Sequence, residues 1–238
     1  MSAISETRLV QVRTRVLKEN DLLARELRRS FRECGVCVAS LVSSPGAGKT
    51  AFLEQTLSLL AARYRVAALV GDLATDNDAR RLARSQVPVG QITTGTVCHL
   101  EARMVQTALA DWNLRGLDFL FIENVGNLVC PATFDLGEQL RLVLFSVTEG
   151  EDKPLKYPTI FNTADVAVIT KMDLASVVEC DLATARRNIQ AVRPGMQILE
   201  VSTKTGQGLS NWIALLEEQK RASDAPPQAA AGKRLPPR

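Results

Sequence analysis

The sequence predicts an α/β fold built on a mostly parallel, doubly wound sheet that is flanked by helices. Short runs of β-branched and other apolar residues carry almost no charge, which is typical of strands buried on both faces of a parallel sheet. Stretches with apolar residues three or four positions apart, typical of amphipathic helices, separate most of these runs. Alternating strands and helices favour parallel βαβ units, whose ligands bind at the carboxyl ends of the strands.

The first expected element is an amphipathic helix over residues 5–33, and Gly35 fits the position just past its end. Expected strands then cover residues 36–42, 66–70, 119–122, 142–147, 166–169 and 197–201. Expected helices cover residues 49–63, 76–84, 98–111, 176–192 and 208–220. We therefore divide the chain into an N-terminal helix (1–33), one domain (34–221) and a tail (222–238).

Composition and charge narrow the possible classes of protein. The chain has 238 residues, 46% hydrophobic and 23% charged, with a formal net charge of +3. Residues 222–238 are rich in Ala, Pro, Lys and Arg without periodicity, which predicts a disordered tail. The basic residues from Lys220 onward account for the positive charge, so the domain itself is nearly neutral. This distribution gives little support to nucleic-acid binding.

The sequence also predicts a cytoplasmic protein. No apolar run reaches the roughly 18 residues of a membrane-spanning helix, and the N-terminus lacks the layout of a signal peptide. The five cysteines, without an export signal, indicate a reducing compartment rather than a disulfide framework. We expect neither a membrane nor a nucleic acid among its partners.

Residues 43–50, with the sequence SSPGAGKT, follow the first expected strand and open the next helix. In that context glycines let the backbone approach phosphates, and successive N–H groups at a helix N-terminus hold negative charge. Lys49 would reach the β- and γ-phosphates, and the Thr50 hydroxyl would ligate Mg²⁺. Ser43 stands where this pattern usually has Gly. The sequence thus predicts a P-loop NTPase with phosphate-binding residues Pro45, Gly46, Ala47, Gly48, Lys49 and Thr50.

Three further segments indicate guanine as the base. Residues 170–173 (TKMD) resemble an Asn-Lys-x-Asp motif, in which the carboxylate of Asp173 would accept hydrogen bonds from guanine and Lys171 would cover the base. Thr170 replaces the usual Asn. The loop Ser202, Thr203 and Lys204 resembles the one that contacts guanine O6. Residues 123–126 (ENVG) close a strand where a Walker-B acid and a switch glycine would lie, which completes the pattern of a P-loop GTPase domain.

Cys98, His99 and Cys130 form a separate candidate constellation. His99 is the only histidine, and two thiolates with one imidazole suit a cation such as Zn²⁺ or Ni²⁺. From the residues alone, buried cysteines and a surface histidine are the favoured interpretation. Adjacent ligands are awkward for one chain to place around an ion, and a site on a dimer axis would relieve that difficulty.

Over residues 30–215 the chain resembles the HypB family, the GTPases that help insert nickel into [NiFe]-hydrogenase. The resemblance is carried by residues 43–50, 71–72, 75–79, 91–92, 94–95, 98–100, 122–131, 134–138 and 146–158. It implies a SIMIBI-class GTPase that dimerises with GTP and serves a partner chaperone and the hydrogenase large subunit. We expect the isolated chain to hydrolyse GTP slowly, because no free catalytic base is evident in the sequence. Ser at the first P-loop position is usual in that family.

The resemblance also implies roles for individual residues. Cys98, His99 and Cys130 become a Ni²⁺ or Zn²⁺ site at the dimer interface. Asp72 and Glu123 become carboxylates that act beside Mg²⁺ or position water, with Asp76 and Asp78 as further candidates. The expected catalytic residues are Lys49, Asp72, Glu123, Lys153 and Lys156, and one of the last two would reach the partner subunit's nucleotide.

Several features depart from the family pattern. The chain has neither the N-terminal cysteine motif nor the histidine-rich stretch of many bacterial members, so we do not expect nickel storage. Thr96 and Val97 stand where Lys and Gly are usual, and Glu101 stands where Asp is usual.

Three alternatives stay open. One is a nucleotide-gated adaptor that transfers no metal. A second is a related GTPase that matures another metalloenzyme, although the Cys-Pro-His motif of the urease accessory GTPase is absent. A third is nucleic-acid binding through the basic tail.

Overall fold

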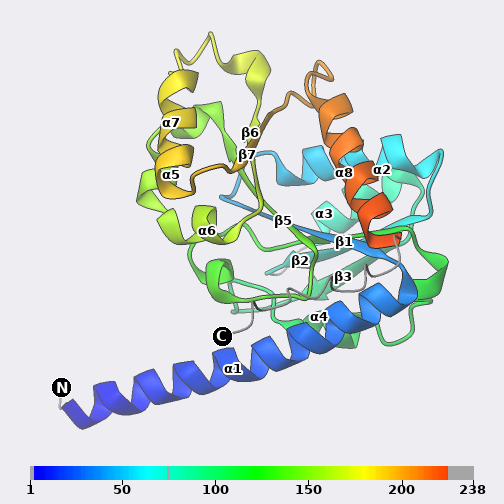
Figure 1. Ribbon diagram of the computed structural model, residues 1–238, viewed down its shortest axis with the longest axis vertical. Helices are drawn as coiled ribbons and strands as arrows, with labels where there is room; N and C mark the ends of the chain where they lie inside the picture. Colours follow the sequence, from blue (N-terminus) through cyan, green and yellow to red (C-terminus); the bar gives the residue numbers. More distant parts are fainter. Residues whose placement is uncertain (1–2, 74–75, 225–238) are drawn as a thin grey trace, which may run out of the picture.

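The computed structural model describes residues 3–73 and 76–224, and its centre is a single sheet of seven parallel strands (Figure 1). The strand order is β3-β2-β4-β1-β5-β6-β7. The strands are β1 (Cys37–Ser43), β2 (Val66–Asp72), β3 (Val89–Thr93), β4 (Phe119–Glu123), β5 (Leu140–Ser146), β6 (Val166–Thr170) and β7 (Gln197–Glu200). The expected α/β class is confirmed, with a sheet that is parallel throughout.

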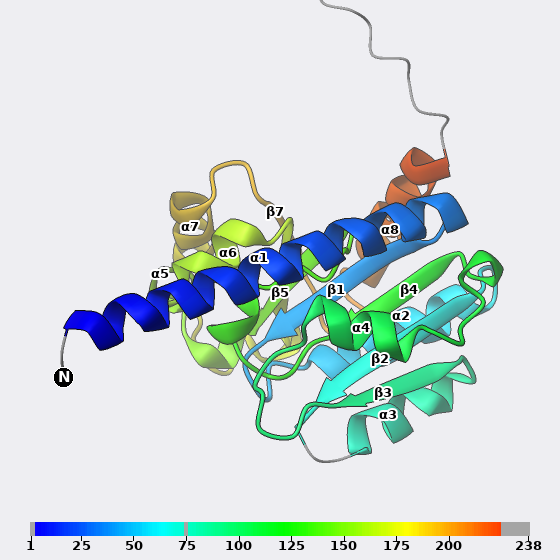
Figure 2. The same ribbon diagram turned by 90° about the horizontal axis from the view of Figure 1, so that it is seen from below.

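Helices cover both faces of the sheet. They are α1 (Ala3–Cys34), α2 (Lys49–Ala61), α3 (Asn77–Leu82), α4 (Ala102–Ala108), α5 (Lys153–Lys156), α6 (Pro158–Thr163), α7 (Leu182–Val192) and α8 (Leu209–Asp224). Side chains alternate between the faces of β1, as the pleat of a strand requires. Ala39 and Leu41 belong to the core under α2, α3 and α8, whereas Val38 packs in the core under α1 and α4. Figure 2 shows α1 and α4 on the same face.

The strand order places the loop after β1 at the point where the chain changes the side of the sheet on which it adds strands. β1 lies between β4 and β5, with Leu41 beside Glu123 and Ser43 beside Leu144. The chain leaves β1 toward β2 on one side and leaves β5 toward β6 on the other. Loops that part in opposite directions open a crevice at the carboxyl ends of the strands, and ligands of such sheets bind there.

Some expected elements were wrong or missing. β3 was not expected, because Gly90 and Gln91 interrupt its apolar pattern and pairing with β2 alone forms the strand. The helix expected at 98–111 begins only at Ala102, after a bend at residues 98–99. The helix expected at 176–192 begins at Leu182, because the Asp181 side chain accepts the Thr184 N–H and caps it there. Helices α5 and α6 were not expected either.

The chain termini agree with the sequence in part. The N-terminal helix is confirmed as α1, which ends before Gly35, a residue with a φ of +71°. Its N-terminal end projects past the sheet (Figure 1). α8 continues to Asp224, three residues past the expected boundary, and the rest of the expected tail, 225–238, lies outside the described residues.

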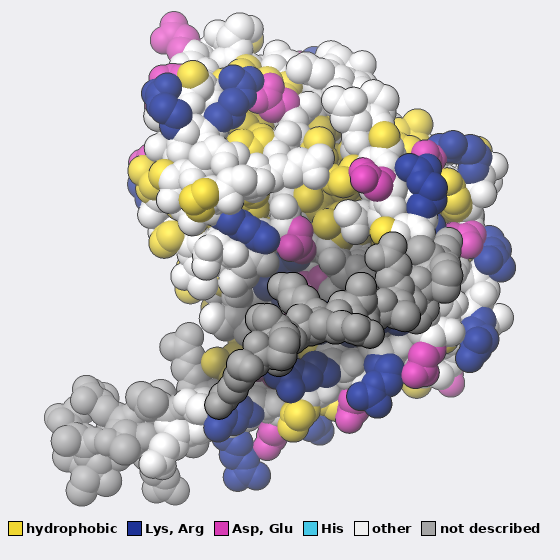
Figure 3. Space-filling view, viewed as in Figure 1, with side chains coloured by type: hydrophobic (Ala, Val, Ile, Leu, Met, Phe, Trp, Pro, Cys, Tyr) yellow, Lys and Arg dark blue, Asp and Glu magenta, His cyan; other side chains and the backbone are white. Residues whose placement is uncertain are grey.

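Surface charge is mixed. On the face shown in Figure 3, Lys and Arg side chains are interspersed with Asp and Glu. Within residues 3–73 and 76–224, no helix combines the length and the apolar character that crossing a membrane requires.

Candidate functional site

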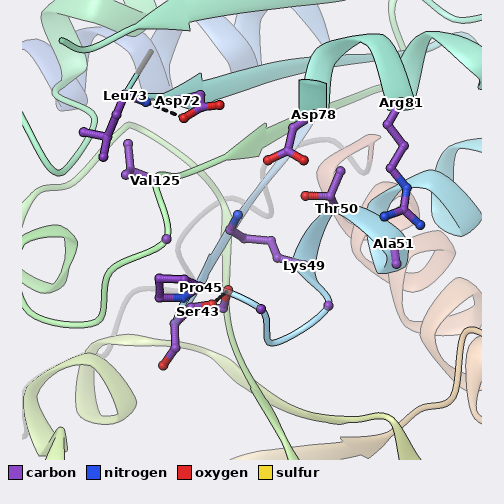
Figure 4. Close-up of a pocket in the computed structure, with 14 residues that line it drawn as sticks. Ser43, Pro45, Lys49, Thr50, Ala51, Asp72, Leu73, Asp78, Arg81 and Val125 are labelled. Atoms are coloured by element: carbon purple, nitrogen blue, oxygen red, sulfur yellow. Dashed lines mark hydrogen bonds between the residues drawn. The ribbon is translucent and has the colours of Figure 1, made fainter. Parts of the chain in front are cut away.

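The loop between β1 and α2 forms one wall of a cavity of about 470 Å³ at the carboxyl end of the sheet (Figure 4). Gly46 and Gly48 have φ values of +75° and +91°, a conformation that glycine adopts without steric cost. The N-terminus of α2 follows directly, so backbone N–H groups and the helix dipole favour negative charge here. Gly126, after β4, packs so closely on this loop that a Cβ there would lie 3.2 Å from Pro45 Cα.

Lys49, Thr50 and Glu123 are in direct contact. Lys49 Nζ lies 2.7 Å from Glu123 Oε1, and the same oxygen accepts a hydrogen bond of 2.6 Å from the Thr50 hydroxyl. Glu123 is fully buried, and its Oε2 atom has no hydrogen-bond partner within the described part of the chain. An unused carboxylate oxygen beside a hydroxyl is a donor set that suits Mg²⁺.

Asp72 and Asp78 line the opposite wall. They come from the end of β2 and from α3, and Figure 4 shows them across the cavity from the Lys49 side chain. Asp72 Oδ1 accepts the Leu73 N–H at 2.5 Å. Asp76, the other candidate on this segment, pairs with Arg80 at 2.7 Å.

Arg81 also lines this cavity, and the sequence analysis missed it. Its guanidinium pairs with Glu54 of α2 at 2.7 Å. The available signal was its position three residues after Asp78, which places both side chains on one face of a helix.

Thr170 connects the segment expected to bind the base with the P-loop. Its hydroxyl lies 2.5 Å from the Ala47 carbonyl oxygen, to which it donates, and 3.2 Å from that of Phe145. Lys171 has a φ of +58°, and its Cε lies 4.0 Å from where a Cβ on Gly48 would be. Threonine at this position therefore supports the phosphate loop, and the lysine stem runs beside that loop.

The two segments expected to read guanine are in contact with each other. Asp173 Oδ1 accepts a 2.6 Å hydrogen bond from the hydroxyl of Ser202, which is buried. The Ser202 hydroxyl oxygen in turn accepts the Thr205 N–H at 3.2 Å. Thr203 and Lys204 follow on this loop, half-buried and exposed respectively. A carboxylate held in place by a buried hydroxyl is oriented before any base arrives.

Cys98, His99 and Cys130 come together within one chain. The two Sγ atoms are 2.8 Å apart, and one ligand atom from each of the three residues lies within 4.8 Å of the others. A single chain therefore brings these three ligand atoms together, although two of the residues are adjacent in sequence. The reason is the bend at residues 98–99, which turns neighbouring side chains to the same side.

The imidazole of His99 is suited to bind a metal ion. Among the described residues neither ring nitrogen has a hydrogen-bond partner, although Glu101 Oε1 lies 3.4 Å from Nε2. Burial lowers the pKa of His99 and outweighs the nearby Glu101 carboxylate, which raises it. The lowered pKa favours the neutral imidazole that ligates metals. The hydrogen bond from Cys98 and burial raise the pKa of the Cys130 thiol. Two thiols and an unpartnered imidazole fit Zn²⁺ or Ni²⁺.

The segment after β4 contacts the P-loop through Gly126, and it also contacts the backbone of residues 98–100. Asn124 Oδ1 accepts the N–H of Leu100 at 3.0 Å. Asn127 Nδ2 donates to the carbonyl of Cys98 at 3.3 Å. The segment that begins at Glu123, which contacts Lys49 and Thr50, therefore ends at Cys130.

Lys153 and Lys156 lie elsewhere. Lys153 Nζ pairs with Glu149 at 2.9 Å, and Lys156 Nζ pairs with Asp152 at 2.7 Å. Neither lysine is among the described residues that line the cavity.

Comparisons with known proteins point to one family of nucleotide-binding proteins. The family model described as the CobW/HypB/UreG nucleotide-binding domain matches residues 37–200. A hydrogenase maturation factor HypB from Azotobacter chroococcum is 44% identical over 221 residues, covering 92% of this chain and 72% of that protein. A hydrogenase/urease maturation factor HypB from Helicobacter hepaticus is 41% identical over 220 residues, covering 90% of this chain and 89% of that protein.

A solved structure is similar as well. The crystal structure of HypB from Helicobacter pylori in complex with nickel matches with a TM-score of 0.82 and 39% identity. The match covers 89% of this chain and 99% of that one. A family model that covers most of the domain, together with these relatives, shows that the chain belongs to the HypB branch of the CobW/HypB/UreG family of nucleotide-binding proteins.

Proposed function

We propose that this protein is a GTP-hydrolysing metallochaperone that delivers nickel during [NiFe]-hydrogenase maturation. The observation that carries the proposal is the Cys98, His99 and Cys130 cluster, whose ligand atoms lie within 4.8 Å of one another. Cys130 follows Gly126, which lines the P-loop cavity, by four residues. Relatives named as hydrogenase maturation factors and a similar structure in complex with nickel support the same function.

In the proposed reaction the chain acts mainly by positioning and charge. Lys49 would leave Glu123 and bind the β- and γ-phosphate oxygens, while P-loop N–H groups hold the rest of the phosphate chain. Thr50, Asp72 and Glu123 would hold Mg²⁺, which neutralises charge on the phosphates when bound. The carboxylate of Asp173, oriented by the Ser202 hydroxyl, would accept hydrogen bonds from the N1–H and the 2-amino group of guanine.

Nucleotide state would reach the metal ligands through residues 123–130. Asn124 and Asn127 hold the backbone of Leu100 and Cys98, so a shift of this segment on GTP binding changes the separation of the two thiols. We further propose that GTP favours a homodimer whose interface includes Cys98, His99 and Cys130. Lys153 or Lys156 would then add positive charge at the partner subunit's phosphates.

The proposed partners follow from this role. A partner chaperone and the hydrogenase large subunit would exchange nickel with the dimer in the cytoplasm. Hydrolysis of GTP would return the dimer to the state with lower metal affinity, so one interface couples the two ligands.

Native mass spectrometry with GTPγS or GDP and one equivalent of Ni²⁺ or Zn²⁺ tests the proposal. We expect a GTPγS dimer that holds metal, and loss of that metal in Cys98→Ala and Cys130→Ala. Cys180→Ala is the matched control, because Cys180 lies outside the cluster. A GTPγS dimer without metal would contradict the metallochaperone and leave a nucleotide-gated adaptor.

A second candidate is a protein that also serves urease. The Helicobacter hepaticus relative is named a hydrogenase/urease maturation factor, and the match covers 90% of this chain and 89% of that protein. Adding the nickel-loaded protein and GTP to extracts that hold immature hydrogenase or immature urease distinguishes the two. Activation of urease alone would replace the first candidate.

A further inference from the structure

The N-terminal helix is hydrogen-bonded to both segments that carry the metal-ligand cluster. Asn20 of α1 is only 5% exposed. Its side-chain Nδ2 donates to the carbonyl of Asp135 at 2.8 Å, and its Oδ1 accepts the N–H of Ala102 at 2.8 Å. One buried amide thus joins two backbone positions that are far apart in sequence.

Both positions lie next to cluster residues. Ala102 is the third residue after His99 and the first of α4, so its N–H has no acceptor inside that helix. Asp135 follows Phe134, whose ring is 4.0 Å from the His99 ring, centroid to centroid. The short helix over residues 130–133 leads from Cys130 to Phe134. Asn20 therefore spans the gap between the segment of Cys98 and His99 and the segment of Cys130.

Further contacts hold the segment of Phe134 and Asp135 in place. Arg28, two turns along α1, pairs with Asp135 at 2.6 Å. Arg141 donates to the carbonyl of Phe134 at 2.8 Å and pairs with the buried Glu138 at 2.7 Å. The segment that supports the His99 ring is thereby fixed to α1 on one side and to β5 on the other.

We propose that Asn20 is a positioning residue of the metal site, which rests on the proposed function of the Cys98, His99 and Cys130 cluster. It acts through the backbone of Ala102 and Asp135 by setting the separation of the two ligand-bearing segments. Contacts of this kind, one step removed from the ligands, change metal affinity by about 10- to 100-fold when they are removed. α1 is then part of the metal site, and not only a helix docked on the domain.

Asn20→Ala tests the proposal when it is compared with Phe31→Leu. Phe31 is fully buried on the same helix, in the core under α1 and α4, so its shortening loosens α1 without removing the bridge. Ni²⁺ affinity is measured by competition with a chelator, and thiolate-to-metal absorption reports the ligand set. Urea unfolding of both variants shows how much stability each has lost.

We expect Asn20→Ala to bind Ni²⁺ at least about tenfold more weakly than the parent chain, with altered thiolate absorption. Phe31→Leu should keep the parent affinity and spectrum despite a loss of stability. Parent-like binding by Asn20→Ala would overturn the proposal, as would an equal loss of affinity in a Phe31→Leu protein of equal stability.

A second measurement needs no metal. In a glutathione redox buffer the Cys98 and Cys130 thiols pass two electrons to glutathione disulfide, giving one protein disulfide and two glutathione thiols. Asn20→Ala should lower the equilibrium fraction of that disulfide, because the thiols are held together less often. If the parent chain binds no Ni²⁺ but this shift occurs, the proposed function fails and the positioning role stands. If the parent binds Ni²⁺ and neither readout moves, the positioning role fails.

Discussion

Glu123 accepts hydrogen bonds from Lys49 and Thr50 on a single carboxylate oxygen, at 2.7 Å and 2.6 Å. The carboxylate is fully buried, and the Lys49 side chain is nearly so. A buried ion pair of this kind is costly to break, because the remaining charge loses its partner in a medium of low polarity. The P-loop lysine and the acid at the end of β4 therefore stabilise each other until phosphate oxygens compete for the lysine.

Replacing Lys49 should remove both catalysis and part of the stability. In Lys49→Ala we expect GTP hydrolysis at least about 100-fold below the parent, because one charge-assisted contact to the transferred phosphate is lost. The nucleotide-free variant should also lose about 3 kcal/mol in its free energy of unfolding, since Glu123 is left buried and unpaired. Phosphate release and urea unfolding measure the two effects.

The double variant Lys49→Met with Glu123→Gln serves as the control for that prediction. It removes both charges at similar volume, so most of the stability should return while hydrolysis stays absent. Hydrolysis at the parent rate in Lys49→Ala would show that the active site has been assigned wrongly.

Asp173→Asn should change which base is bound. An amide at this position cannot accept the two donors of guanine, but it can donate to the extra carbonyl of xanthine. We expect GTP affinity to fall by about 100-fold and XTP affinity to rise. Competition against a fluorescent nucleotide measures both. Lys204→Ala, on the exposed part of the neighbouring loop, is the control, and an unchanged ratio of GTP to XTP affinity in Asp173→Asn would contradict the assignment.

Thr170→Val should loosen the P-loop. The substitution removes the hydroxyl that donates to the carbonyl of Ala47, and a buried carbonyl without its donor costs about 1–3 kcal/mol. Nucleotide affinity should fall together with stability. Thr170→Asn restores a donor and should recover affinity, as measured by titration calorimetry, whereas equal behaviour of the two variants would show that the hydroxyl has no role.

Stability should decline at acidic pH partly because of Asp135. Burial opposes its ionisation, but hydrogen bonds from Arg28 and the Gly137 N–H outweigh it, and the pKa of Asp135 is lowered. Because its pKa is lower in the folded state, ionised Asp135 stabilises the fold. This stabilisation is complete above the pKa of an unfolded Asp, about 3.9, and is lost as pH falls through the pKa of the folded state.

Asp135→Asn isolates that contribution. At pH 7 we expect the variant to be about 1 kcal/mol less stable, a modest figure because the side chain is one-third exposed. The difference from the parent should shrink toward zero below about pH 4 in urea unfolding series. A difference that is constant from pH 7 to pH 3 would contradict the role of Arg28.

Lys156 is the more exposed of the two lysines that we propose to act across subunits, and we expect it to be the one that does so. Its side chain is 62% exposed, whereas that of Lys153 is 16% exposed and held by Glu149 and the Tyr157 ring. Lys156→Ala should lower hydrolysis about tenfold only at concentrations that favour dimers. Mixing Lys156→Ala with Lys49→Ala should restore activity, because one subunit supplies the P-loop and the other supplies Lys156. Failure of the mixture to recover would place Lys156 outside the reaction.

The sequence by itself determined the α/β class and the P-loop, because both depend on local patterns. Uncharged β-branched runs specify buried parallel strands, and the spacing of Gly46, Gly48 and Lys49 specifies a phosphate loop whatever surrounds it. The lengths of α4 and α7 were not determined in this way, because the bend at Cys98 and the cap at Asp181 stop helices that the apolar spacing alone would extend.

Only the tertiary structure decided how the sites are connected. Asn20 shows this most clearly: its spacing from Val16 and Leu23 places it on the apolar face of α1. Only the fold shows that it bridges Ala102 and Asp135. β3 likewise forms because β2 offers it hydrogen-bonding partners, despite its weak apolar pattern. Contacts between residues 80 to 115 positions apart depend on which faces of helices and sheet meet. Packing of the whole chain sets those faces, and periodicity within a single segment does not encode them.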